Sequence, residues 1–112
     1  MNGKILAVIE TDEGRVRESS FEVVELARHL AADGDGSVCA AVLGADPAGA
    51  AAEVARRGAE KVYAVQDPLL AHYTADGHTA ALAALMAGQR IGTVLFAHTP
   101  TGWDVAPRLA AR

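Results

Sequence analysis

Ile5-Leu6-Ala7-Val8-Ile9 is an unbroken apolar run near the start of a 112-residue chain, and three of its five residues are β-branched. A run without polar alternation is typical of a strand covered on both faces, as in a parallel sheet. Three further runs have the same character: Val38-Cys39-Ala40-Ala41-Val42-Leu43, Val62-Tyr63-Ala64-Val65 and Ile91-Gly92-Thr93-Val94-Leu95-Phe96. The sequence therefore predicts four strands of one parallel sheet.

Two helices are expected between the first three runs. The first begins at Ser19, which precedes Glu22 by three residues and so can form a capping box with it, and it ends at Gly34. The second is capped by Asp46 and ends at residues 56–58, where two arginines and a glycine favour a helix terminus. Each of these helices connects one predicted strand to the next.

Two more helices complete the alternation. The third is expected over about residues 76–88, and the fourth begins at Thr101 or Asp104 and is still running at Arg112, so we expect the sequence to be truncated. The polar residues 10–18 surround a glycine and predict a small hairpin. Strand and helix alternate four times, which predicts a doubly wound α/β fold with helices on both faces of the sheet.

Composition excludes several classes of protein. The chain has ten Lys and Arg residues and 14 Asp and Glu residues, and the resulting formal charge of −4 argues against nucleic-acid binding. No apolar run approaches the roughly 18 residues of a membrane span, and the start does not resemble a signal peptide. The single cysteine fits a reducing compartment, and eight arginines to two lysines suggest a GC-rich genome. We expect a protein of the bacterial cytoplasm.

Nucleotide-binding motifs are missing from this α/β pattern. The turn after the first run, Glu10-Thr11-Asp12-Glu13-Gly14, has no G-x-G-x-x-G and places acids where a pyrophosphate would lie. The loop after the fourth run offers a weak anion site, in which Thr99 and Thr101 supply hydroxyls and Gly102 permits close backbone approach. Asp104 opposes an anion there, and helix capping is the favoured role of this loop. Thr99, Thr101 and Gly102 are thus only weak candidates for cofactor binding.

The histidines do not form a convincing catalytic or metal site. His72 and His78 lie near Asp67 and Asp76, but their spacing matches no zinc motif, and solvated polar residues are the favoured reading. His98 follows a predicted strand at the end where α/β sheets bind ligands, yet the sequence shows no partner that would make it a general base. We therefore predict no metal site.

Two further residues attract notice because each is single in the chain. Cys39 lies inside a predicted strand, where burial in apolar surroundings makes a thiol inert. Trp103 either packs beneath its loop or projects as a contact for a partner, and the sequence leaves both readings open. No catalytic residue is predicted, so the residues alone indicate a cytoplasmic α/β domain without a visible catalytic set.

Several segments together resemble the N-terminal domain of the electron-transfer flavoprotein alpha subunit, the FixB-like family. The most specific is Thr101-Gly102-Trp103-Asp104-Val105-Ala106-Pro107-Arg108-Leu109-Ala110-Ala111-Arg112, which is similar to the family signature Gly-Arg-Asp-Leu-Ala-Pro-Arg-Leu-Ala-Ala. Trp103 stands where that signature has arginine. The other similar segments are Ile5 to Glu10 with Glu25-Leu26-Ala27, Val42-Leu43-Gly44 with Gly58 to Val62, and Asp67 to Tyr73.

The resemblance implies a fold and a domain organisation. The fold would be a three-layer parallel-sheet sandwich of the Rossmann-like, adenine-nucleotide alpha-hydrolase-like group, with the four runs in the order 3-2-1-4. Residues 1–112 would then be the alpha N-terminal domain, and the C-terminal FAD-binding domain would lie beyond them. FAD is accordingly expected in the intact protein and not within residues 1–112.

The resemblance also implies a function and partners. The intact alpha subunit would form a heterodimer with the beta subunit and carry electrons through FAD from acyl-CoA or other dehydrogenases to a quinone oxidoreductase. This chain would be a scaffold in that electron carrier, not an enzyme. The alternative is a free-standing nucleotide-binding module of the universal-stress type. Its paired glycines are missing from the loop at residues 98–104, which favours the first reading.

Overall fold

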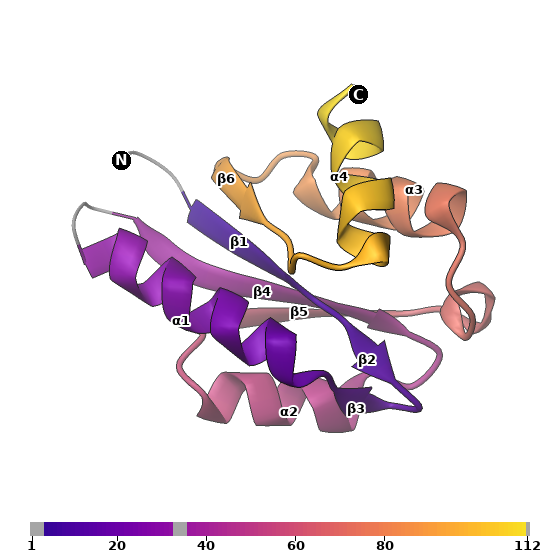
Figure 1. Cartoon of the computed structure of the whole chain (residues 1–112), viewed down its shortest axis with the longest axis horizontal. Coiled ribbons are helices and arrows are strands. Elements are labelled where there is room, and N and C mark those ends of the chain that lie inside the picture. Colours follow the sequence, from indigo (N-terminus) through magenta and orange to yellow (C-terminus); the bar gives the residue numbers. More distant parts are fainter. Residues whose placement is uncertain (1–3, 33–35, 112) are drawn as a thin grey trace.

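A four-stranded parallel sheet forms the centre of the molecule (Figure 1). The computed structural model describes residues 4–32 and 36–111. The sheet contains β1 (Lys4–Ile9), β4 (Ser37–Gly44), β5 (Lys61–Gln66) and β6 (Ile91–Leu95). Its order is β5-β4-β1-β6, with every neighbouring pair parallel. These strands are the third, second, first and fourth apolar runs, so the predicted order 3-2-1-4 is confirmed.

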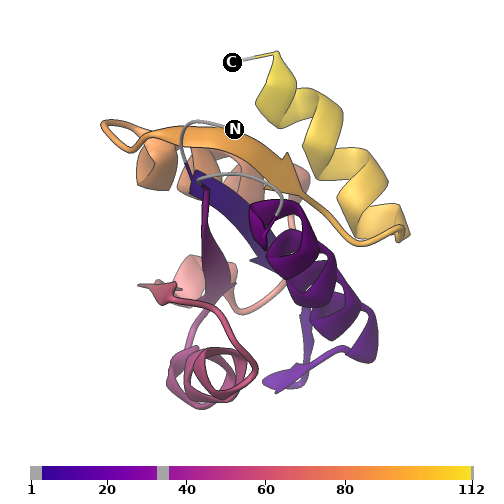
Figure 2. The same ribbon diagram turned by 90° about the vertical axis from the view of Figure 1, so that its left-hand side faces the viewer.

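Helices cover both faces of the sheet, as expected. Helices α1 (Glu18–Ala32) and α2 (Ala48–Arg56) lie on one face, and α3 (Ala75–Met86) and α4 (Pro100–Ala110) lie on the other (Figures 1 and 2). A short 3-10 turn, η1 (Pro68–Leu70), precedes α3. Alternate residues of β1 enter the two cores, because Ala7 packs with the α1 and α2 side and Leu6 packs with the α3 and α4 side. The three-layer α/β sandwich is therefore confirmed.

The central strands are buried on both sides. All residues from Ile5 to Ile9 are buried, and Cys39 in β4 is 2% exposed. This burial raises the pKa of the Cys39 thiol, which agrees with the inert thiol predicted from sequence. None of the described helices has both the length and the apolar character that a membrane crossing requires.

A small hairpin connects β1 to α1. Strands β2 (Thr11–Asp12) and β3 (Arg15–Val16) pair antiparallel around Glu13 and Gly14. Both turn residues have positive φ, 51° and 80°, which is the signature of a type I′ hairpin turn. The hairpin lies beside α2 at the end of β1, so the prediction from the polar residues 10–18 is confirmed (Figure 1).

The starts of the first two helices differ from the prediction. Helix α1 begins at Glu18, so Ser19 is inside the helix and is not its N-cap. The neighbouring Ser20 instead accepts a hydrogen bond from the Glu10 amide at 2.8 Å, which fastens the helix to the end of β1. Helix α2 is capped by Pro47 without a side-chain hydrogen bond, and Asp46 lies one residue outside it. The predicted stop at Gly34 lies outside the described residues.

The other two helices, α3 and α4, begin with the same kind of N-cap. Thr74 caps α3 and accepts a hydrogen bond from the Gly77 amide, and Thr99 caps α4 and accepts one from the Gly102 amide, both at 3.1 Å. A threonine hydroxyl thus satisfies an otherwise unpaired first-turn amide in each helix. Thr101, predicted as an alternative cap of α4, is a residue of its first turn, as the cap is Thr99.

Candidate functional site

A cleft of about 660 Å³ opens at the carboxyl ends of the central strands. This is the edge of a parallel α/β sheet at which ligands commonly bind, next to the point where the strand order reverses between β1 and β6. Its floor is apolar and its rim carries most of the polar groups. Its lining includes Val8, Glu10, Glu13, Arg17, Val42, Asp46, Ala71, Tyr73, His78, Leu82, Phe96, Thr101 and Gly102.

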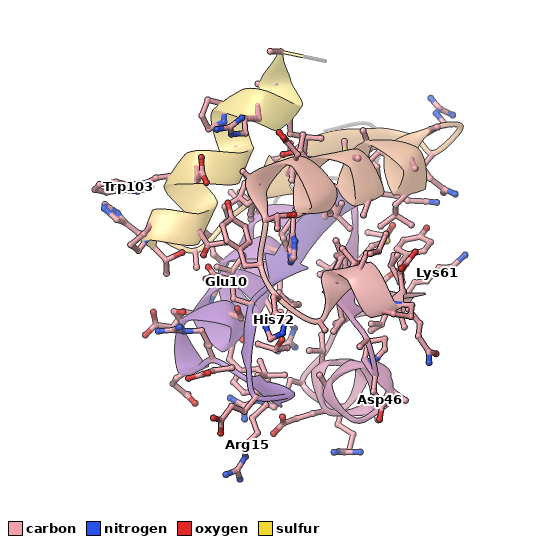
Figure 3. All side chains as sticks on the ribbon, turned by 90° about the vertical axis from the view of Figure 1, so that its right-hand side faces the viewer. Glu10, Arg15, Asp46, Lys61, His72 and Trp103 are labelled. Carbon is pink, nitrogen blue, oxygen red and sulfur yellow. The ribbon has the colours of Figure 1, made fainter. Side chains whose placement is uncertain are left out.

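Glu10 is the acidic residue at the centre of this edge (Figure 3). It follows β1 directly, and the hydrogen bond from its own amide to Ser20 Oγ fixes its backbone. The Thr99 hydroxyl donates a hydrogen bond of 2.6 Å to Glu10 Oε2, and the same hydroxyl oxygen accepts from the Gly102 amide. A carboxylate of the protein therefore lies at the N-terminal end of α4, where the helix dipole stabilises negative charge.

The first turn of α4 makes most of its own hydrogen bonds internally. Pro100 has no amide hydrogen, the Gly102 amide donates to the Thr99 hydroxyl, and the Trp103 amide donates to the Thr99 carbonyl oxygen at 2.9 Å. In the described part of the chain, the Thr101 amide is the one amide of this turn that has no hydrogen-bond partner. An anion at this helix end would therefore meet few available donors.

Gly102 is required by packing. A Cβ atom at this position would run into the Ala97 carbonyl oxygen and would lie 3.3 Å from the Phe96 Cβ. The missing side chain lets α4 approach the end of β6 closely. Of the weak candidates of the sequence, Thr101 and Gly102 line the cleft, whereas Thr99 is outside its lining and is engaged as the cap of α4 and as a donor to Glu10.

A polar network ties the loop before α3 to α4. The Tyr73 hydroxyl donates a hydrogen bond of 2.7 Å to Asp104 Oδ2, and Arg108 Nε donates one of 3.1 Å to Asp104 Oδ1. Arg108 also lies 3.6 Å from Asp76. Partial burial, and to a lesser extent the hydrogen bond to Asp104, raises the pKa of Tyr73 to about 12. The hydrogen bond from Tyr73, and to a lesser extent the one from Arg108, lowers the pKa of Asp104. Asp104 serves this network and not the capping of α4.

The histidines are dispersed. His78 lines the cleft and stacks edge-on against Tyr73 at 4.9 Å between ring centres, and burial lowers its pKa, so it is neutral at pH 7. His98 follows β6 at the end of the sheet where ligands commonly bind, but it lies outside the cleft lining and packs against Trp103. Within residues 4–32 and 36–111, no three His, Cys, Asp or Glu side chains gather as metal ligands.

Trp103 projects from the outer side of α4, away from Glu10 (Figure 3). Its side chain is 65% exposed, and its ring centre is 4.7 Å from that of His98. Of the two readings left open by the sequence, the structure therefore supports a projecting residue. Tyr73 and Ser20 also lie at this end of the sheet, and the sequence did not single them out. Their hydrogen-bond partners, Asp104 and Glu10, are 31 and 10 residues away along the chain.

Comparison with known proteins identifies the family. Residues 5–112 match the model of the electron transfer flavoprotein domain. The chain is 34% identical over its whole length to the electron transfer flavoprotein subunit alpha of Bacillus subtilis, covering 34% of that protein. It is 36% identical over 93% of its length to the corresponding subunit of Syntrophomonas wolfei, covering 32% of it.

A third relative has a different name. The chain is 34% identical, over 91% of its length, to Protein FixB of Azorhizobium caulinodans, of which it covers 28%. It thus spans about a third of the length of the curated relatives that it matches. The family model and these relatives name the same family that the segment at residues 101–112 resembles. This chain belongs to the electron transfer flavoprotein domain family.

Proposed function

We propose that residues 1–112 are the N-terminal scaffold domain of an electron-transfer flavoprotein alpha subunit. The observation that carries this proposal is the match, over 93 to 100% of the chain, to proteins named as alpha subunits, at 34 to 36% identity. The fold is compatible with such a role, because the central strands of its parallel sheet are buried on both faces and the described residues of its cleft include no set of catalytic groups. In this role the domain supports electron transfer without catalysing a reaction.

The partner in this proposal is the beta subunit. The intact heterodimer carries electrons through FAD from acyl-CoA or other dehydrogenases to a quinone oxidoreductase, in the cytoplasm of a bacterium. The exposed Trp103 gives α4 a large apolar contact that a partner subunit can cover. We assign no nucleic-acid or membrane partner.

The flavin belongs to the part of the alpha subunit beyond residue 112. Two features of the cleft support this assignment. The Glu10 carboxylate occupies the helix end that would otherwise attract a pyrophosphate, and the Gly102 amide is already bonded to Thr99. The same features weigh against a nucleotide-binding module of the universal-stress type.

Co-purification tests the proposal. The tagged 112-residue chain is co-expressed with the untagged beta subunit from the same genome, and an unrelated tagged α/β domain serves as the control. We expect the beta subunit to be retained by this chain and not by the control, and we expect the chain purified alone to be colourless. If the beta subunit is not retained, the scaffold assignment is wrong. A stoichiometric flavin spectrum from the chain alone would instead move the cofactor site into the cleft.

A further inference from the structure

The cleft has the size and place of a small-molecule site. Its volume of about 660 Å³ lies within the roughly 300 to 1,000 Å³ of ligand pockets, and it opens where strand order reverses in the sheet. Its floor is formed by the buried side chains of Val8, Val42 and Leu82. An apolar floor below a polar rim accommodates a flat heterocycle with hydrogen-bonding groups.

The charge of the rim restricts what enters. Glu10, Glu13 and Asp46 line the cleft together with one cation, Arg17, so these groups have a formal charge of −2. His78 adds no charge at pH 7, because burial lowers its pKa. A phosphate in this cleft would lie among like charges, which costs binding energy.

The donors that would hold a phosphate are committed elsewhere. Thr99 directs its hydroxyl hydrogen to Glu10 and its hydroxyl oxygen to the Gly102 amide. The Glu10 carboxylate therefore takes the place of a ligand anion at the end of α4. Thr99 bonds only its Oε2 atom, and its other oxygen, Oε1, can accept a hydrogen bond from a ligand donor. These contacts disfavour a bound phosphate and favour a ligand that donates hydrogen bonds.

We propose that this cleft binds a nucleoside-sized heterocyclic ligand that carries no phosphate, and that Glu10 is the residue that excludes phosphorylated ligands. The proposal concerns a binding site that the scaffold role does not require. Its failure therefore leaves the pairing with the beta subunit untouched.

Adenosine and AMP are the probes, because they differ only in the phosphate. Binding to the 112-residue chain is followed by calorimetry and by the amide NMR shifts of Val8 and Thr101. We expect adenosine to bind about tenfold or more tightly than AMP, since like charges oppose the phosphate. In the near-isosteric variant Glu10→Gln this preference is expected to fall to about threefold or less, because the carboxylate at the end of α4 is neutralised and the formal charge of the rim drops from −2 to −1.

A pair of tryptophan variants locates the site. Ala71 is exposed and lines the cleft, so Ala71→Trp fills its mouth and is expected to abolish adenosine binding. Ala52 is equally exposed on α2 outside the cleft lining, and Ala52→Trp is the control that retains binding. The proposal is overturned if the chain does not bind adenosine, if AMP binds equally well, if Glu10→Gln leaves the preference unchanged, or if Ala71→Trp still binds.

Discussion

Replacing Gly102 by alanine tests how closely α4 packs against the end of β6. The added Cβ would meet the Ala97 carbonyl oxygen and the Phe96 Cβ, and a backbone carbonyl cannot rotate away as a side chain can. Overpacking of this kind costs about 1–3 kcal/mol, and a backbone clash belongs at the upper end. Alanine restricts the unfolded chain and returns about 0.5 kcal/mol. We therefore expect Gly102→Ala to lower the free energy of unfolding by about 2 kcal/mol.

Gly49 provides the matched control. It also lies in the first turn of a helix, α2, but a Cβ there would meet nothing within 4 Å. Gly49→Ala is therefore expected to raise the free energy of unfolding by about 0.5 kcal/mol. Urea denaturation of both variants measures the difference at constant m-value, and a loss of 2 kcal/mol lowers Tm by about 8 °C or more. Equal stability of the two variants would refute the close-packing argument.

The cap of α4, the Tyr73–Asp104 hydrogen bond and the buried Cys39 thiol can each be tested separately. Thr99→Val removes the cap of α4 and is expected to lower the free energy of unfolding by about 1 kcal/mol in urea denaturation, whereas Thr99→Ser retains it. Absorbance titration is expected to show Tyr73 ionising with a pKa of about 12, and Asp104→Asn is expected to return that pKa toward 10. Because the pKa of Tyr73 is higher in the folded protein than in the unfolded chain, the stability that this hydrogen bond contributes is complete below pH 10 and is lost as the pH rises toward 12. Cys39 is expected to react with a thiol reagent slowly in the native protein and rapidly in urea, and fast native labelling would contradict its burial.

The sheet was predictable because its information is local and repeated. Each strand is a continuous apolar run, and such runs pair in parallel only when helices cover both faces. The hairpin was equally accessible, since Gly14 lies within the polar residues 10–18 and readily adopts the positive φ that a two-residue turn requires. The order of the strands came from family resemblance and not from periodicity.

The helix starts were less predictable because several residues compete for each cap. Asp104 has a suitable side chain, but Tyr73 and Arg108 engage its carboxylate, and Tyr73 lies 31 residues away. The bond between Thr99 and Glu10 spans 89 residues and exists only because β1 and β6 are neighbours. A threonine three residues before a glycine marks both α3 and α4, and this repeated spacing was the signal available in the sequence.

The mass of the assembly formed with the beta subunit is the most direct test of the scaffold assignment. The 112-residue chain and the purified beta subunit of the same genome are mixed in equal amounts and analysed by light scattering after size exclusion. We predict a single species with the summed mass of one copy of each protein. Two separate species at every concentration, each with its own mass, would contradict the assignment of this chain as an alpha-subunit scaffold.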